Sequence, residues 1–252
     1  MKVLGIIPAR YGSTRLEGKP LVDICGKPMI QRVYEQAKKA LNFVLIATDD
    51  VRIEKAVKEF GGNVVMTSTN HNTGTNRCLE AYEVFTKETG KQFDVVLNIQ
   101  GDEPLLATTQ IESLVSCFES ADTEMATLVI PTLKNEDLNS GVFVVFDKDF
   151  NAMYFSRSVI PAVRDEDKKK WSKNNTFYKH VGMYGFTPKA LNRFAYLEQT
   201  TLENIEKLEQ LRWLENGNQI KVAITNEVSI PVDTKDDVEK VKKLLEAQSK
   251  KL

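Results

Sequence analysis

The first half of the chain alternates between short apolar runs and longer segments in which apolar residues recur at helical spacing. Such runs are typical of buried strands, and the periodic segments are typical of amphipathic helices. The expected strands are residues 3–7, 43–47, 64–66 and 94–99, and the expected helices are residues 27–40, 51–60, 77–86 and 108–119. This order predicts an α/β fold with a mostly parallel, doubly wound, Rossmann-like sheet covered by helices on both faces.

The second half of the chain is richer in expected strands. They are residues 125–130, 141–146, 152–156, 177–186 and 220–225, with helices at 200–214 and 235–245. Thr200 and Glu203 form a capping-box pattern at the start of the first helix, whose apolar stripe would be Leu202, Ile205, Leu208 and Leu211. Residues 164–175 are charged without an apolar period, which predicts a solvated segment. We therefore expect one domain over residues 1–252, with a smaller β layer inserted within residues 125–200.

Composition narrows the class of protein. The chain has 252 residues, of which 42% are hydrophobic, enough for one large α/β domain or two small ones. The net charge of −1 does not indicate a protein whose surface is generally basic, as nucleic-acid binding would require. Because no signal peptide and no run of about 18 apolar residues is present, we expect a cytoplasmic protein that binds neither nucleic acid nor membrane.

The three cysteines have spacings that fit neither a zinc site nor a disulfide framework. They are Cys25, Cys78 and Cys117. The apolar neighbours of Cys25 and Cys117 predict that both side chains belong to the core.

A cationic segment, IIPARYGSTRLEGKPL at residues 6–21, lies between the first expected strand and the first expected helix. Phosphates bind at this place in open α/β sheets. The segment carries three cations, Arg10, Arg15 and Lys19, and three residues that allow close approach, Gly12, Ser13 and Gly18. It fits neither a dinucleotide fingerprint nor a Walker A loop. A solvated basic loop is one interpretation, and a triphosphate clamp is the one we favour.

Two carboxylates are expected near strand ends. Asp102 follows the strand at 94–99, and Asp233 lies in a turn after the strand at 220–225. Carboxylates in such positions suit Mg²⁺, which takes few protein ligands together with phosphate oxygens. Taken singly, either residue could instead serve as a helix cap or turn residue. His180 alternates with Tyr184 along an expected strand, and by itself it could be a core histidine.

Motifs along nearly the whole chain resemble those of the 3-deoxy-manno-octulosonate (Kdo) cytidylyltransferases, or CMP-Kdo synthetases. In order, they are IIPARYGSTRLEGKPL, IATDD, MTS and GTNR, NIQGDEP, YFSRSVIP, KHVGMYGF, LEQLR and PVDT. The resemblance implies a nucleotidyltransferase that converts CTP and Kdo into CMP-Kdo and diphosphate for the lipopolysaccharide core. It implies that the anomeric hydroxyl attacks the α-phosphate in line, with Mg²⁺ as the cofactor. It also implies a homodimer, with the inserted layer binding the sugar and forming the dimer contact.

The resemblance assigns roles to particular residues of this chain. Catalysis would rest on Lys19, Arg15, Asp102 and Asp233, of which Asp102 and Asp233 would bind the metal. The nucleotide would be held by Pro8, Ala9, Arg10, Ser13, Arg15, Lys19, Ser68, Gly74, Arg77 and Gln100. The sugar acid would be held by Gln100, Arg157, His180, Tyr184, Glu209 and Gln210, with Arg157 as a fork for the carboxylate.

Four positions depart from the family pattern: Glu17, Asn76, Phe143 and Pro231. Phe143 replaces a usual lysine and Asn76 replaces a usual acid, so the preferred sugar stays open. The alternatives are a related ulosonic acid, such as 8-amino-3,8-dideoxy-Kdo, and a nucleotide-binding regulatory protein without turnover. The intact Lys19, Asp102 and Asp233 argue against loss of turnover.

Overall fold

The computed structural model describes residues 1–13, 15–71, 73–134, 136, 138–228 and 230–249. Thr14 of the cationic segment therefore lies outside the described residues. The chain forms two compact units, and the second is inserted into the first. The first unit is Met1–Ile111 with Val228–Leu252, and the second is Glu112–Glu227, which is wider than the layer expected at 125–200.

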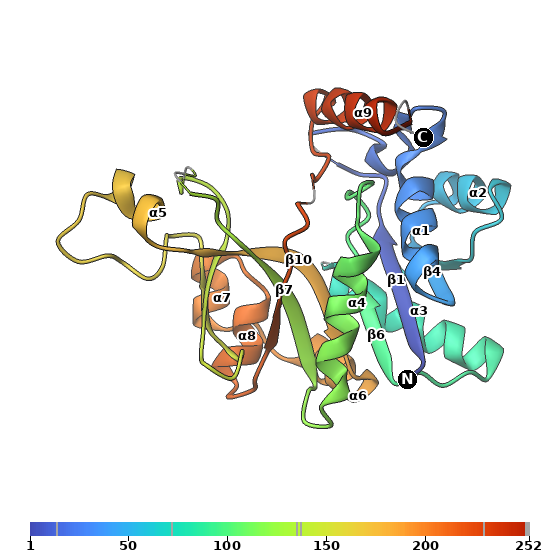
Figure 1. Ribbon diagram of the computed structural model, residues 1–252. Coiled ribbons are helices and arrows are strands. Elements are labelled where there is room, and N and C mark those ends of the chain that lie inside the picture. The colour runs from blue at the N-terminus through green and yellow to red at the C-terminus, as the bar shows by residue number, and fades with distance from the viewer. Residues whose placement is uncertain (14, 72, 135, 137, 229, 250–252) are drawn as a thin grey trace. The chain divides into compact units, whose positions relative to one another are not determined.

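The first unit contains a parallel sheet. Strand β1 (Val3–Ala9) pairs with β4 (Phe43–Thr48) on one side and β6 (Val95–Asn98) on the other, and β4 also pairs with β5 (Val64–Met66). The crossover helices are α1 (Met29–Ala40), α2 (Val51–Glu59) and α3 (Gly74–Thr89). Right-handed crossovers place α1 and α2 on one face of the sheet and α3 on the other (Figure 1). The doubly wound arrangement expected from the sequence is confirmed.

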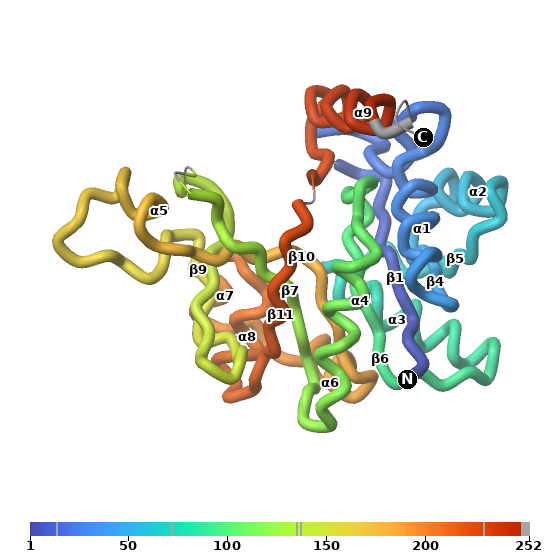
Figure 2. Tube along the Cα trace, in the orientation of Figure 1, coloured from blue at the N-terminus to red at the C-terminus, as the bar shows by residue number. Residues whose placement is uncertain are grey.

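Both chain ends belong to the first unit, where helix α9 (Lys235–Ser249) lies over a small hairpin (Figure 2). The hairpin consists of β2 (Asp23–Ile24) and β3 (Lys27–Pro28), and it follows the short 3₁₀ helix η1 (Lys19–Leu21). One apolar cluster joins these elements: Leu16, Ile24, Met29, Val232, Val238 and Val241. Leu16 belongs to the cationic segment, so this segment is anchored in the core from within.

The second unit is built mainly from antiparallel pairs. Strand β7 (Met125–Pro131) pairs antiparallel with β10 (Tyr178–Phe186) and parallel with β11 (Lys221–Ile224). Strand β8 (Phe143–Phe146) pairs antiparallel with β9 (Ala152–Ser156) and β10. Helices α4 (Thr108–Ser116) and η2 (Cys117–Glu119) precede β7, and α6 (Pro188–Tyr196), which the sequence pattern did not predict, follows β10.

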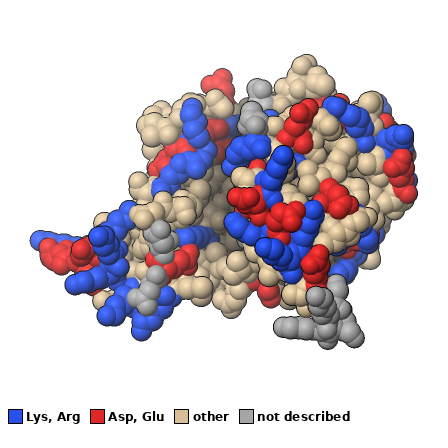
Figure 3. Space-filling view, turned by 90° about the horizontal axis from the view of Figure 1, so that it is seen from above, with Lys and Arg blue, Asp and Glu red and all other residues tan. Residues whose placement is uncertain are grey.

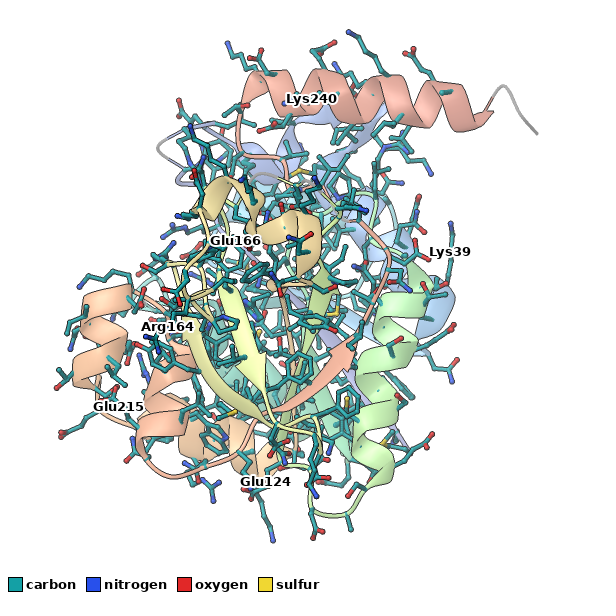
Figure 4. The ribbon with its side chains drawn as sticks, turned by 60° about the vertical axis from the view of Figure 1, so that its left-hand side comes forward. Lys39, Glu124, Arg164, Glu166, Glu215 and Lys240 are labelled. Carbon is teal, nitrogen blue, oxygen red and sulfur yellow. The ribbon has the colours of Figure 1, made fainter. Side chains whose placement is uncertain are left out.

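The helix expected at residues 200–214 is wrong as a single element. It is divided into α7 (Thr201–Glu206) and α8 (Gln210–Glu215), because Lys207 adopts a left-handed conformation with a φ of 53°. Ile205 is consequently 73% exposed rather than part of a continuous apolar stripe. The expected capping box at Thr200 and Glu203 is present. Glu215, labelled in Figure 4, accepts the backbone N–H of Leu202 at 2.9 Å and so joins the two helices.

The charged segment 164–175 contains two short helices, η3 (Lys168–Lys170) and α5 (Trp171–Asn174). Figure 3 shows Lys and Arg gathered with Asp and Glu over this segment, at the left of the view, rather than a basic stripe. Glu166, labelled in Figure 4, accepts the indole N–H of Trp171 and the side-chain N–H of Asn174, each at 2.9 Å. The segment is mostly exposed, as predicted, but it has this local order.

Two further expectations concern burial. Cys25 is exposed at the hairpin turn and Cys117 is partly buried, so the prediction that both are core residues is wrong; Cys78 is buried. Among the residues that the structure describes, no helix is long and apolar enough to cross a membrane.

Candidate active site

Lys19 lies between two carboxylates of the first unit. Its Nζ is 2.6 Å from Asp102 Oδ2 and 3.0 Å from Asp233 Oδ1. Arg15 Nη2 contacts the same oxygen of Asp233 at 3.0 Å. The four residues that the sequence assigned to catalysis therefore meet, although they come from three distant parts of the chain.

The backbone explains why the two carboxylates meet. Asp102 follows the carboxyl end of β6, and its carbonyl oxygen accepts the N–H of Val232 at 2.9 Å. Asp237, in the first turn of α9, accepts the N–H groups of Asp233 at 3.3 Å and Thr234 at 3.0 Å. Hydrogen bonds from Thr234 and then Lys240 lower the pKa of Asp237 to about 2, so this carboxylate is charged. The turn that carries Asp233 is thus fixed at both ends.

The same two carboxylates suit a divalent cation. Within the described residues, no group of three His, Cys, Asp or Glu side chains could hold a metal ion. Asp102 and Asp233 supply only two side chains, but their oxygens already converge on one positive charge, the ammonium of Lys19. Two carboxylates fit the usual preference of Mg²⁺, which completes its coordination with waters and phosphate oxygens.

A cavity of about 380 Å³ opens beside this cluster. Its lining residues come from the end of β1, the cationic segment, the end of β6 and the turn before α9. They are Pro8, Ala9, Arg10, Gly12, Ser13, Arg15, Lys19, Pro20, Met29, Gln100, Gly101, Asp102 and Asp233. Arg10, Arg15 and Lys19 make it cationic on one side, which suits a chain of phosphates.

A second cavity, of about 220 Å³, shares part of that wall. The shared residues are Pro8, Ala9, Arg10 and Gln100, and the others are His71, Thr73, Gly74 and Arg77. Gly74 begins helix α3, and Thr73 caps it by accepting the N–H of Asn76 at 3.2 Å. The two adjoining cavities can take a ligand with one strongly anionic end and one weakly polar end.

Close packing at the end of β1 explains one glycine. A Cβ atom on Gly101 would stand 3.0 Å from the carbonyl oxygen of Pro8, whereas one on Gly74 would stand at an ordinary contact distance of 3.4 Å from Pro8 Cγ. The loop after β6 therefore approaches β1 most closely with glycine at position 101, and the start of α3 also lies against Pro8. This approach is what brings the two cavities together along Pro8.

Two residues assigned to the nucleotide have structural partners. Arg77 is 4% exposed, and its guanidinium donates to Thr67 Oγ1 at 2.7 Å and Asp49 Oδ2 at 2.6 Å. Ser68 does not line either cavity, and its hydroxyl accepts the N–H of Asn70 at 3.1 Å. Arg77 thus borders the second cavity while holding the loops after β4 and β5 together.

A second cluster lies in the inserted unit, around His180. The hydroxyl of Thr127 donates to the carbonyl oxygen of Met183 at 2.8 Å and lies 2.9 Å from His180 Nε2. When the single hydroxyl proton goes to Met183, His180 donates from Nε2 and Nδ1 is left as an acceptor. Burial lowers the pKa of His180 to about 4, so the ring is neutral at neutral pH.

Tyr184 and the start of α8 complete this cluster. The rings of His180 and Tyr184 lie 5.2 Å apart, although the register between β10 and β7 shifts between Val181 and Tyr184. Burial, followed by the charge of Glu209, raises the pKa of Tyr184 well above its usual range. Gln210 is 2% exposed, and its Nε2 is buried without an acceptor among the described residues. The cluster thus holds a protonated phenol, a neutral imidazole and an amide.

Arg157 has a structural role that the sequence did not predict. Its Nε donates to the carbonyl oxygen of Glu206 at 2.6 Å and its Nη2 to that of Lys207 at 3.2 Å. The Glu206 carboxylate accepts the Arg157 backbone N–H at 3.0 Å and the Ser156 hydroxyl at 2.7 Å. Arg157 therefore stabilises the break between α7 and α8, which positions Glu209 and Gln210.

Comparison with known proteins gives the chain its family. The sequence profile described as cytidylyltransferase matches residues 4–220. A 3-deoxy-manno-octulosonate cytidylyltransferase of Parabacteroides distasonis is 52% identical over 246 residues, which are 95% of this chain and 96% of that protein. This chain belongs to the Kdo cytidylyltransferase family.

Other members of the Kdo cytidylyltransferase family agree in length and fold. A relative in Fusobacterium nucleatum with the same name is 47% identical and covers 96% of each chain. A solved CMP:2-keto-3-deoxy-manno-octonic acid synthetase, complexed with CTP, is 37% identical with a TM-score of 0.88, covering 98% of this chain and 100% of that one. An 8-amino-3,8-dideoxy-manno-octulosonate cytidylyltransferase of Shewanella sp. is 47% identical over 97% of this chain and 99% of its own.

Two of the four departures from the Kdo cytidylyltransferase pattern, Phe143 and Asn76, have local structural explanations. Phe143 is 0% exposed and packs with Leu138, Val159 and Phe177. The Oδ1 of Asn76 accepts the hydroxyl of Thr73 at 2.7 Å, within the cap of α3. Both side chains are therefore part of their unit's own packing, which favours tolerated structural replacements over a change of substrate.

Proposed function

We propose that this chain transfers the cytidylyl group of CTP to 3-deoxy-D-manno-octulosonate, giving CMP-Kdo and diphosphate. Family membership supports the reaction. The observation that carries it is the meeting of Lys19, Asp102 and Asp233 at the cationic cavity beyond β1 and β6. An arrangement of this kind binds and neutralises a triphosphate without needing a covalent nucleophile.

The proposed reaction is an in-line displacement at phosphorus. The anomeric hydroxyl oxygen of the sugar forms a bond to the α-phosphorus of CTP. The bond from that phosphorus to the oxygen bridging to the β-phosphate breaks, and diphosphate leaves with its electron pair while the hydroxyl proton passes to solvent. Negative charge grows on the leaving diphosphate, so Arg10, Arg15 and Lys19 would stabilise the transition state more than the ground state.

Asp102 and Asp233 would hold Mg²⁺ in this proposal. When bound, the metal would supply positive charge to the phosphate oxygens. The chain's own contribution is to fix the two carboxylates, through Val232 and Asp237, before the ligands arrive. Lys19 would then be free to contact a phosphate, since the metal would take over its two partners.

The sugar acid would bind to the cluster around His180. The neutral imidazole can accept a hydrogen bond from a sugar hydroxyl at Nδ1, and the Tyr184 phenol can donate a hydrogen bond. Gln210 brings a buried amide N–H that has no acceptor within the described residues, which a sugar hydroxyl would satisfy. Glu209 would accept from a second hydroxyl.

Diphosphate release tests the proposed reaction directly. The purified chain is given CTP, ATP, GTP or UTP with Mg²⁺, each with Kdo, and the sugar nucleotide is identified by mass spectrometry. We expect release with CTP and a product of the mass of CMP-Kdo. Binding of CTP without release of diphosphate from it, whichever ulosonic acid is added, would instead identify a regulatory protein.

A second candidate substrate is 8-amino-3,8-dideoxy-Kdo, because the Shewanella relative named for that sugar is 47% identical. Direct competition between the two sugars, with both products measured in one reaction, separates the candidates. We expect Kdo to be preferred, since the buried environment of Phe143 removes the sequence-based reason for a changed sugar.

We also propose that the chain acts as a homodimer in the cytoplasm and supplies CMP-Kdo for the lipopolysaccharide core. The inserted unit exposes the large apolar side chains of Leu133, at 71%, and Met153, at 66%, which would be available to a protein contact. Light scattering at micromolar concentration should give twice the mass of the chain. A monomer mass at every concentration would contradict the dimer.

A further inference from the structure

The cationic segment is held from outside as well as from the core. The guanidinium carbon of Arg52 lies 3.3 Å from the centroid of the Tyr11 ring. Arg52 also forms a two-point contact with Asp50, from Nε to Oδ1 at 2.9 Å and from Nη2 to Oδ2 at 2.6 Å. Asp50 is in turn the N-cap of α2 and accepts the backbone N–H of Arg52 at 2.9 Å. A continuous chain of contacts thus runs from a helix end to an aromatic ring in the segment.

Tyr11 transmits this contact to Lys19 through Gly18. The carbonyl oxygen of Tyr11 accepts the N–H of Gly18 at 3.2 Å, which closes the segment into a loop. Gly18 has a φ of 64°, and a Cβ atom there would stand 3.0 Å from the Tyr11 hydroxyl oxygen. The ring therefore packs directly over the residue that precedes Lys19. A displaced ring would loosen the turn at Gly18, which leads directly into Lys19.

The core anchor of the cationic segment lies at Leu16. Leu16 is buried in the cluster under α9, and Lys19 N donates to its carbonyl oxygen at 3.1 Å. Leu16 holds the middle of the loop, but Arg10 and Tyr11 lie before it. Arg52 is held beside this part of the segment by Asp50, whose hydrogen bonds raise the pKa of its guanidinium.

We propose that Tyr11, Arg52 and Asp50 form a clamp that positions the cationic loop for the β- and γ-phosphates of the nucleotide. Arg52 acts as a positioning residue: it touches Tyr11 and Asp50, and it does not line either cavity. The clamp fixes the loop before the ligand binds, so less conformational freedom is lost on binding. The inference rests on the proposed function, since it assumes that the loop holds a triphosphate.

The decisive measurement compares CTP with CMP. Calorimetric affinities for both nucleotides are measured with Mg²⁺ and without sugar, for the natural chain and for Arg52→Ala, Arg52→Lys, Tyr11→Leu and Tyr11→Phe. Lys58→Ala is the matched control, because Lys58 lies on the same helix and pairs with Glu54 at 2.6 Å. Thermal unfolding of each variant reports any general loss of structure.

We expect Arg52→Ala and Tyr11→Leu to weaken CTP about five- to tenfold, the size of one lost cation–π and ion-pair contact, and CMP less than about twofold. Tyr11→Phe keeps the ring and should restore most of the affinity, while Arg52→Lys loses the flat stack and should restore little. Lys58→Ala should match the natural chain.

Two results would overturn the clamp. One is unchanged CTP affinity in Arg52→Ala, and the other is an equal loss for CTP and CMP, which indicates general damage. Failure of the proposed reaction would look different: the natural chain would bind CTP but release no diphosphate with Kdo. In that case the ratio of CTP to CMP affinities would still decide the clamp.

Discussion

Val232 donates its backbone N–H to the carbonyl oxygen of Asp102 at 2.9 Å. This bond joins the turn before α9 to the end of β6, residues that are separated by just over half of the chain. It places Asp233 where its carboxylate shares the ammonium of Lys19 with Asp102. Since both acids then face one point, each should be needed for the same step.

We therefore expect Asp102→Asn and Asp233→Asn each to lower Mg²⁺-dependent turnover by at least about a hundredfold, the loss seen when one charge-stabilising group is removed. Diphosphate release checks this, with circular dichroism to confirm the fold. Asp94→Asn is the matched control, since Asp94 immediately precedes β6 and caps the N–H of Lys2 at 2.6 Å. Near-natural turnover by either active-site variant would remove the metal assignment.

Lys19→Ala and Arg10→Ala should raise the apparent KM for CTP about ten- to a hundredfold. This is the effect expected from the loss of one charged hydrogen bond. The apparent KM for Kdo should change far less, because both side chains line the cationic cavity of the first unit. Steady-state kinetics with each substrate varied in turn measures this. Lys39→Ala, at the far end of α1 (Figure 4), is the control. An unchanged constant for CTP would contradict the triphosphate assignment.

His180 should make the fold sensitive to mild acid. Its folded pKa of about 4 lies below the ordinary histidine value of 6.5, so the unfolded chain binds the proton more readily between these values. Stability is therefore complete above pH 6.5 and falls as the pH drops toward 4, by up to about 3 kcal/mol. Urea unfolding across this range should show a shallower acid-side loss for His180→Gln. Equal slopes in both proteins would show that His180 does not carry the effect.

The buried pair between Glu203 and Arg212 should be important for the second unit. Arg212 Nε donates to Glu203 Oε2 at 2.8 Å, Nη2 donates to Oε1, and both side chains are buried. Removing one partner strands a buried charge, so Glu203→Gln or Arg212→Ala should cost about 3–5 kcal/mol of unfolding free energy. Arg164→Ala, in an exposed pair with Asp165, should cost less than about 1 kcal/mol. Similar losses in both would mean that burial adds nothing here.

Phe143→Lys should destabilise the fold rather than improve the use of Kdo. Phe143 is fully buried, and the partly exposed Lys179 Nζ lies 5.7 Å from its ring and already pairs with Glu136, so a new ammonium would be buried near a like charge. The loss should be at least about 3 kcal/mol, as for an uncompensated buried charge. Phe143→Leu is the control for lost volume alone. A stable Phe143→Lys protein with better use of Kdo would restore the sequence-based interpretation.

The sequence determined the elements whose signals are local. Apolar runs marked β1, β4 and β6, and the loop after β1 stood out because Arg10, Arg15 and Lys19 are close along the chain. The rule that parallel strands end at one edge predicted that Asp102 would lie near this loop. The turn after the strand at 220–225 marked Asp233 as a second candidate, and the family motifs implied that it joins Asp102 as a metal ligand.

Tertiary structure decided the features that depend on contacts between distant residues. Helical periodicity continues through residues 200–214, but the chain breaks at Lys207, where Arg157 and the Glu203–Arg212 pair hold two short helices. A periodic pattern records which side chains are apolar and says nothing of where a polar side chain finds its partner. The stacking of Arg52 on Tyr11 had no sequence signal for the same reason. In the sequence, each residue looks like an ordinary solvent-facing position, and only the fold brings the two together.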